Sequence, residues 1–284
     1  MSIAIVTDSN SGIGPEEAAR MGVKVVPMPV NINGREYLEN VNLEREFFYK
    51  MQEQGASITT SQPSPGCLAD LWEELLPSCD GVLYIPMTSG LSSAYATASL
   101  LAEDYDGRVR VVDAKRISVP MWQIVQDAVV LSRSGLSLEE LGRRLEKNAL
   151  NSSVYISPTT LEYLKRGGRI TPAAAAIGAV LNIKPVLQIQ GGRVDAYGKA
   201  RGMRQAVEKM FDALDRDLEE RFGGRPTHVF AAYSGMPDVG QAWKEAVQKH
   251  YPDREVRCDP LSLCICCHTG PCAVGVGCAV YEED

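Results

Sequence analysis

The stretch GVLYIPMTSGLSSAY, residues 81–95, is the part of the sequence from which the fold is most directly deduced. Residues 81–85 form an apolar run of the length of one buried strand, and Pro86 ends it. A loop of Ser, Thr and Gly follows, and the small residues 92–102 then predict a helix. A buried strand that turns directly into a helix is typical of an open α/β sheet, where ligands bind outside the carboxyl ends of the strands.

Two interpretations of this turn are open from its residues alone. Its hydroxyls belong to Thr88, Ser89, Ser92 and Ser93, and the helix start adds unpaired N–H groups, so together they form a candidate anion site. The alternative is that Ser92 only caps the helix, as serine commonly does.

Composition and charge exclude several classes of protein. The 284 residues are 45% hydrophobic and 23% charged, which is ordinary for a globular protein, and the length predicts two domains. The net charge of -7 argues against a nucleic-acid-binding surface and against general adsorption to anionic membranes. No apolar run has the length of a membrane span, and residues 1–8 lack the pattern of a secretory signal, so we expect a cytoplasmic protein without an integral membrane segment.

The pattern of predicted elements changes near residue 150. Before it, short apolar strands alternate with longer helices, which predicts an N-terminal α/β domain over residues 1–152 with a parallel sheet. Residues 23–32 are expected to form one strand that is kinked at its prolines or lies at a sheet edge, and Ser137 with Glu140 predicts a helical capping box.

After residue 152 we expect an α+β domain, residues 153–284, whose strands are largely antiparallel. Residues 186–190 and 193–197, separated by two glycines, predict a hairpin. The run of small and apolar residues 173–181 predicts a buried helix.

Hydroxyls and one arginine are the leading candidates for ligand contacts. Thr60 and Ser61 follow a predicted strand, as residues 89–93 do, so the two turns are expected to face one another across a crevice and to suit a carboxylate or phosphate. Arg169 ends the basic sequence KRGGR and offers a bidentate fork to an oxyanion. Ordinary turn chemistry and a helix C-terminus remain the alternatives for these residues.

Six of the eight cysteines lie between residues 258 and 278. The spacing of CICCHTGPC, residues 264–272, does not form paired zinc knuckles, so no metal site is predicted and structural or incidental thiols are favoured. A thiol- or metal-dependent enzyme or sensor built on this cluster is the alternative function. His268 is predicted to lie in a polar turn, as an exposed proton donor or anion contact.

Six short motifs occur in one order along the chain and resemble those of the DegV family. They are VTDS (6–9), TTSQPS (59–64), SGLS (89–92), LKRGGRI (164–170), NIKP (182–185) and HTGP (268–271). The resemblance implies a bacterial lipid carrier with two α/β domains around a buried long-chain fatty acid. This fatty acid is the expected ligand, and no cofactor is expected. It also implies a non-enzymatic subunit that presents the fatty acid to an ATP-binding fatty acid kinase partner.

The same resemblance assigns roles to individual residues. It implies that the ligand carboxylate is bound among Thr60, Ser61, Ser89, Ser92 and Ser93. Two further residues, Arg169 and His268, are implied to lie near the ligand mouth. The chain departs from the family pattern at residues 118–122, and if this segment lines the tunnel, Met121 and Trp122 are expected to shorten or reshape it.

Overall fold

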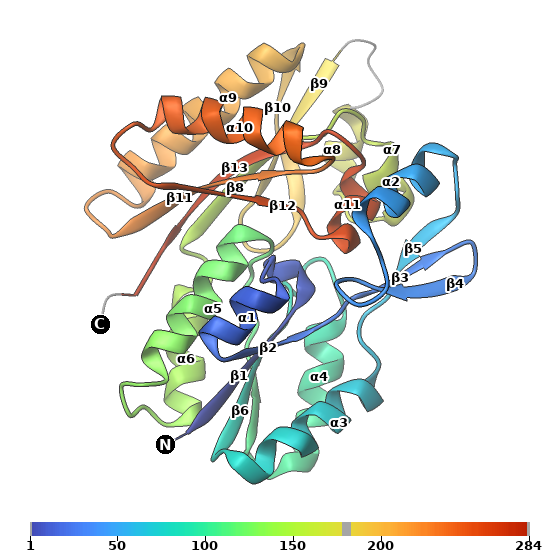
Figure 1. Cartoon of the computed structure of the whole chain (residues 1–284). Coiled ribbons are helices and arrows are strands. Elements are labelled where there is room, and N and C mark those ends of the chain that lie inside the picture. Colours follow the sequence, from blue (N-terminus) through green and yellow to red (C-terminus); the bar gives the residue numbers. More distant parts are fainter. Residues whose placement is uncertain (1, 178–182, 283–284) are drawn as a thin grey trace.

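The computed structural model of the chain describes residues 2–177 and 183–282. Within these residues the strands form three sheets, and the fold class is α/β, as predicted. Figure 1 shows the largest sheet above the parallel sheet of the N-terminal half, with α9 and α10 on the side that faces away from it.

The N-terminal half is built on a parallel four-stranded sheet with the order β2-β1-β6-β7. Its alternating residues pack on both faces: Ile5 and Leu83 contact α5 and α6, whereas Val6 and Tyr84 contact α3 and α4. The elements are β1 (Ile3–Asp8), α1 (Pro15–Met21), β2 (Val23–Val26), α3 (Pro65–Leu75), β6 (Gly81–Ile85), α4 (Ala94–Ala102), β7 (Val109–Val111), α5 (Val119–Leu131) and α6 (Leu138–Asn148).

A small antiparallel sheet, β4-β3-β5, projects from this half, and α2 connects β4 to β5. Its elements are β3 (Pro29–Ile32), β4 (Arg35–Leu38), α2 (Arg45–Glu53) and β5 (Ile58–Thr60). The prediction of a single strand over residues 23–32 is therefore wrong, because β2 and β3 belong to different sheets. The chain leaves the first sheet at Pro27, which has no N–H to continue a ladder.

The C-terminal half is built on a six-stranded sheet with the order β10-β9-β8-β13-β11-β12. As predicted, its strands pair antiparallel, except for the parallel pair β11 and β12. Its elements are β8 (Ser152–Ser157), α7 (Glu162–Gly167), α8 (Pro172–Ile177), β9 (Ile183–Ile189), β10 (Val194–Arg201), α9 (Met203–Arg216), β11 (Thr227–Tyr233), α10 (Pro237–His250), β12 (Val256–Pro260), α11 (Leu263–Thr269) and β13 (Val274–Val280).

Local predictions for this region had different outcomes. The hairpin of β9 and β10 is confirmed, and so is the capping box, in which Ser137 and Glu140 bond reciprocally. The predicted helix over residues 173–181 is found as α8 up to Ile177, with residues 178–182 outside the described part. Its burial is confirmed only in part, since Ala174 is buried whereas Ala173 and Ala176 are exposed.

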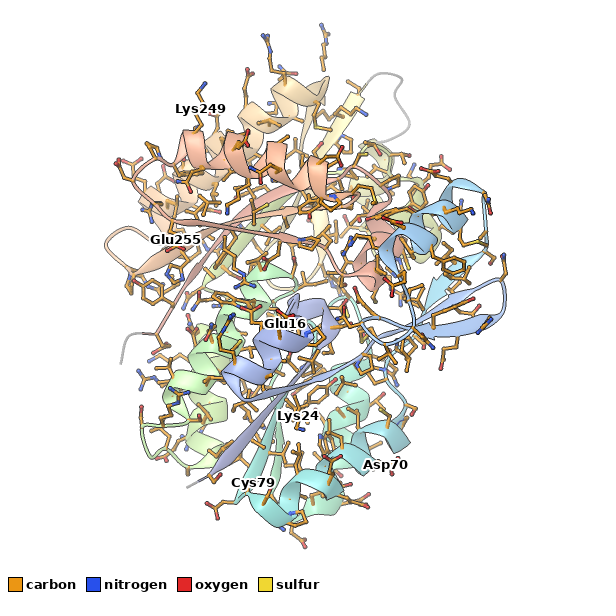
Figure 2. All side chains as sticks on the ribbon, in the orientation of Figure 1. Glu16, Lys24, Asp70, Cys79, Lys249 and Glu255 are labelled. Atoms are coloured by element: carbon orange, nitrogen blue, oxygen red, sulfur yellow. The ribbon has the colours of Figure 1, made fainter. Side chains whose placement is uncertain are left out.

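The predicted division into domains 1–152 and 153–284 stays a prediction, and it falls at the start of β8. Charged side chains such as Lys249 lie on the outer side of α10, and Cys79 lies at the end of the molecule remote from the six-stranded sheet (Figure 2). Among the described residues, none of the helices combines the length and the apolar character needed to cross a bilayer.

Candidate ligand site

A cavity of about 510 Å³ lies where the two halves meet. One wall is formed by residues that follow strands or precede helices of the N-terminal half, including Met28, Met87 and Ile117. The opposite wall is the inner face of the six-stranded sheet, with Ile156 and Phe230 among its residues. This volume is within the range of small-molecule sites, and its position beyond the carboxyl ends of parallel strands is the one expected for an α/β sheet.

The central strand of the large sheet leaves room for the cavity because it lacks side chains there. Gly275 and Gly277 of β13 both line the cavity. A Cβ at Gly277 would lie only 2.6 Å from the carbonyl oxygen of Ser153 on β8, so no side chain fits at this point. At Gly275 and Gly277 the cavity is therefore bordered by the backbone of β13, with larger side chains on the neighbouring strands.

One end of the cavity is polar and opens to solvent. Thr60 and Ser61 at the end of β5 and Ser92 and Ser93 before α4 all line it. The two turns that were predicted to face one another are thus brought to the same cavity. Among these residues, Ser61 and Ser93 are exposed, which places this end at the surface.

The turn before α4 is arranged differently from the predicted cap. The helix begins at Ala94, and its preceding residue, Ser93, makes no side-chain capping bond. Instead the Ser92 hydroxyl accepts a hydrogen bond of 3.1 Å from the Ala94 N–H. The Ser93 hydroxyl is therefore not committed to the helix end.

Of the five hydroxyls that the resemblance assigns to the ligand carboxylate, Ser89 is the one that does not line the cavity. Its Oγ accepts a hydrogen bond of 2.8 Å from Lys115 Nζ, and its N–H donates to Asp113 Oδ1 at 3.2 Å. These partners direct Ser89 to the outside of the loop. A role for Ser89 in ligand binding stays a prediction, as do the roles of the other four hydroxyls.

His268 lies in the last turn of α11, so the prediction of an exposed polar turn is wrong. The helix forms there because Ser262 caps it, accepting from the Ile265 N–H at 3.2 Å, and because its residues are mostly apolar. His268 Nε2 lies 2.9 Å from the Thr60 hydroxyl, whereas Nδ1 is buried and has no hydrogen-bond partner in the described part of the chain.

Burial, aided by the positive charge of Arg169, lowers the pKa of His268 to about 4. The imidazole is therefore neutral at physiological pH. The ring packs so closely against α7 that a Cβ on Gly167 would overlap it. In the neutral form with the proton on Nε2, the ring donates to Thr60 and leaves the threonine hydroxyl free to donate elsewhere.

Arg169 lies at the exposed edge of the polar end. Its Nε donates to the Leu91 carbonyl oxygen at 3.3 Å, which ties the segment after α7 to the turn before α4. Arg169 is thus brought next to the turn that carries Ser92, and its role near the ligand mouth stays a prediction.

A polar network lies next to the cavity at residues for which the sequence pattern alone predicts no role. Asp8, at the carboxyl end of β1, accepts hydrogen bonds from the Met87 N–H at 2.7 Å and from Asn10. Asn10 in turn accepts from the Ser262 hydroxyl at 2.8 Å and so connects β1 to the start of α11. Burial raises the pKa of Asp8 to about 6. The motif VTDS contained the signal, but no role followed from it without the contacts.

The three cysteines of α11 are buried packing residues. Cys264, Cys266 and Cys267 are buried in α11, and burial raises the pKa of all three thiols, that of Cys266 to about 11. In residues 2–177 and 183–282, no group of three or more His, Cys, Asp or Glu side chains is placed to hold a metal ion. Thiols with raised pKa values are poor nucleophiles, so this arrangement is that of packing residues.

Comparison with known proteins connects this site to one family. Residues 2–280 match the family model described as "Uncharacterised protein, DegV family". A DegV domain-containing protein from Deinococcus radiodurans is 34% identical over 277 residues, which cover 97% of this chain and 98% of the relative.

Two solved structures share the fold over nearly their whole length. The first, described as "Fatty Acid Binding of a DegV family Protein from Thermus thermophilus", has a TM-score of 0.89 and 36% identity, covering 99% of this chain and 100% of that one. The second is DegV, a fatty acid binding protein from Bacillus subtilis, with a TM-score of 0.87, 27% identity and the same coverage. The match extends over both halves and the cavity between them, and the chain belongs to the DegV family.

Proposed function

We propose that this protein binds a long-chain fatty acid in the cavity, with the carboxylate at the polar end and the acyl chain along the six-stranded sheet. The observation that supports this best is the division of the cavity: the hydroxyls of Thr60, Ser61, Ser92 and Ser93 gather at one open end, and the remainder, apart from Ser118, is lined mainly by apolar residues and glycines. The Thermus thermophilus and Bacillus subtilis relatives, described as binding fatty acids, support the same ligand class.

The energetics of such a ligand match this division. A dozen buried methylenes contribute on the order of 10 kcal/mol of gross transfer free energy, which favours a deep apolar cavity. A carboxylate taken into the same cavity loses its hydration and requires several donors. Thr60, Ser61, Ser92 and Ser93 are those donors in our proposal, with Arg169 supplying charge at the solvent edge.

The neutral state of His268 contributes to this arrangement. A hydroxyl that accepts from His268 Nε2 directs its own proton away from the ring, toward the cavity. With the proton on Nε2, Thr60 is thus a donor to the cavity without a second positive charge inside the site.

The decisive test is the analysis of lipid bound to the purified protein. Denaturation followed by mass spectrometry should release about one fatty acid per chain, and the delipidated protein should rebind it. Ser92→Ala should weaken rebinding because it removes a donor that lines the cavity, whereas Ser89→Ala should leave it unchanged because Ser89 lies outside. A delipidated protein that binds no fatty acid would refute the proposal.

We further propose that the protein is not itself an enzyme and presents the bound fatty acid to an ATP-binding kinase partner. The polar end opens at the surface, so the carboxylate is within reach of a second protein. Mixing the loaded protein with ATP and a bacterial fatty acid kinase subunit should yield an acyl phosphate, trapped by hydroxylamine as the hydroxamate. The loaded protein with ATP alone should yield none.

A further inference from the structure

Six residues form one row across the large sheet, one from each strand. Strand pairing places them opposite one another in the order Val194, Ile189, Val154, Gly277, Phe230 and Arg257. The first five line the cavity and the sixth does not. Along this row the cavity therefore runs across the strands and ends between β11 and β12.

The polar end lies at the β10 side of this row. Ile170 forms a bridge with Val194, and the preceding residue, Arg169, reaches Leu91 beside the hydroxyl turn. From β10 to β11 there are four strand spacings, roughly 19 Å in total. A fatty acid with its carboxylate among the hydroxyls would thus extend toward Phe230.

Phe230 closes the row as a bulky apolar wall. Its side chain is 2% exposed and packs with Val119 and Ala279 in a small cluster of its own. The ring meets the Trp122 ring edge-on, with 6.4 Å between centroids and an interplanar angle of 75°. Neither Trp122 nor Met121 lines the cavity. Trp122 therefore affects the shape of the cavity only indirectly, by its contact with Phe230.

The wall behind Phe230 is held in place by charged groups. Trp122 Nε1 donates to Glu17 at 2.9 Å, and Arg257 forms two bonds to the same carboxylate, at 2.8 and 2.9 Å. The Arg257 guanidinium also lies 4.0 Å from the centre of the Trp122 ring. Because Glu17 and Trp122 come from the N-terminal half and Arg257 from β12, these contacts fix the end of the cavity across both halves.

We propose that Phe230 is the end stop that determines the length of acyl chain this protein accepts, with Trp122, Glu17 and Arg257 as the fixed support behind it. This inference rests on the proposed function and adds its selectivity. A chain that reaches Phe230 fills the cavity, and a longer one must displace the ring or leave its carboxylate short of the hydroxyls.

The test is competition binding of a homologous series of saturated fatty acids to the delipidated protein. Each additional buried methylene raises affinity about fourfold, so the wild-type affinity should rise with length and then fall once the chain exceeds the row. Phe230→Ala should move the optimum to longer chains, since the space of the ring becomes available. Phe230→Trp should move it to shorter ones.

Phe222→Ala is the matched control. Phe222 is also 2% exposed, but it belongs to the core on the other face of the sheet and does not line the cavity. This variant should keep the wild-type optimum. If Phe230→Ala does not fold, Phe230→Leu removes less volume and should shift the optimum in the same direction.

The outcomes separate this inference from the proposed function. An unchanged optimum in folded Phe230→Ala or Phe230→Leu, with wild-type binding intact, would overturn the end stop alone. The same holds if Phe222→Ala shifts the optimum equally. Absence of binding by the wild-type protein at every length would overturn both.

Discussion

Replacing Thr60 with Val tests the polar end of the site most directly. The change keeps the shape of the side chain and removes the hydroxyl that faces His268 Nε2 at 2.9 Å. His268 Nδ1 already has no partner within the described residues, so in the ligand-free variant neither ring nitrogen has a protein partner there. The variant therefore loses a proposed carboxylate donor and a structural hydrogen bond together.

The two losses affect different measured quantities. A hydrogen bond to a charged group contributes about 1.5–3 kcal/mol, so fatty-acid affinity should fall by about 10-fold to 100-fold. The loss of the neutral bond leaves His268 Nε2 without its protein partner and should lower the free energy of unfolding of the ligand-free protein by about 1–3 kcal/mol. Binding and stability are therefore measured separately.

Fluorescent fatty-acid displacement measures the first quantity and urea denaturation of the delipidated protein measures the second. Thr59→Val is the matched control, since Thr59 is the neighbouring residue of β5, is exposed and does not line the cavity. Thr60→Ser retains the hydroxyl and should retain most of the affinity. If Thr60→Val bound fatty acid as tightly as Thr59→Val, the proposed donor role of Thr60 would be refuted.

Three further predictions follow from burial and backbone geometry. The pKa of His268 is about 4 in the folded protein against 6.5 for an unperturbed histidine, so the unfolded state binds more protons between these values. Its contribution to stability should be lost as the pH falls from 6.5 toward 4, and wild type minus His268→Gln should show this in urea denaturation. Gly192→Ala should destabilise the protein by about 2 kcal/mol or more, because φ is 97° and a Cβ would overlap the Thr88 hydroxyl. In native protein a thiol reagent should modify Cys67 and Cys272 first, since both are exposed, and should leave the cysteines of α11 unmodified.

Each of these three has an outcome that contradicts it. A pH-independent difference between wild type and His268→Gln would show that the histidine does not titrate as its burial requires. Gly224→Ala, with φ of 75° and nothing within 4 Å of the added carbon, should cost less than Gly192→Ala, and equal costs would argue against the contact with Thr88. Rapid labelling of Cys264, Cys266 or Cys267 would favour the alternative function, a thiol-dependent enzyme or sensor.

The sequence by itself determined the parts of the molecule that depend on local patterns. Apolar runs of strand length alternate with helical segments up to residue 150, and this alternation led to a parallel sheet and to ligand binding beyond its strand ends. Paired glycines between two β-branched runs led to the hairpin of β9 and β10, and a Ser with a Glu three residues later led to the capping box. These patterns depend only on residues that are close together in the sequence, so they can be read without the tertiary structure.

The tertiary structure alone decided which distant residues share the cavity. Gly270 and Pro271 predict a turn at His268, yet the Ser262 cap and burial among apolar residues extend a helix to it. Ser89 and Ser92 are close in sequence, but only Ser92 lines the cavity, because Lys115 and Asp113 bind Ser89 on the outside. The row that ends at Phe230 is set by strand register across the sheet, and register between strands far apart in sequence leaves no local signal.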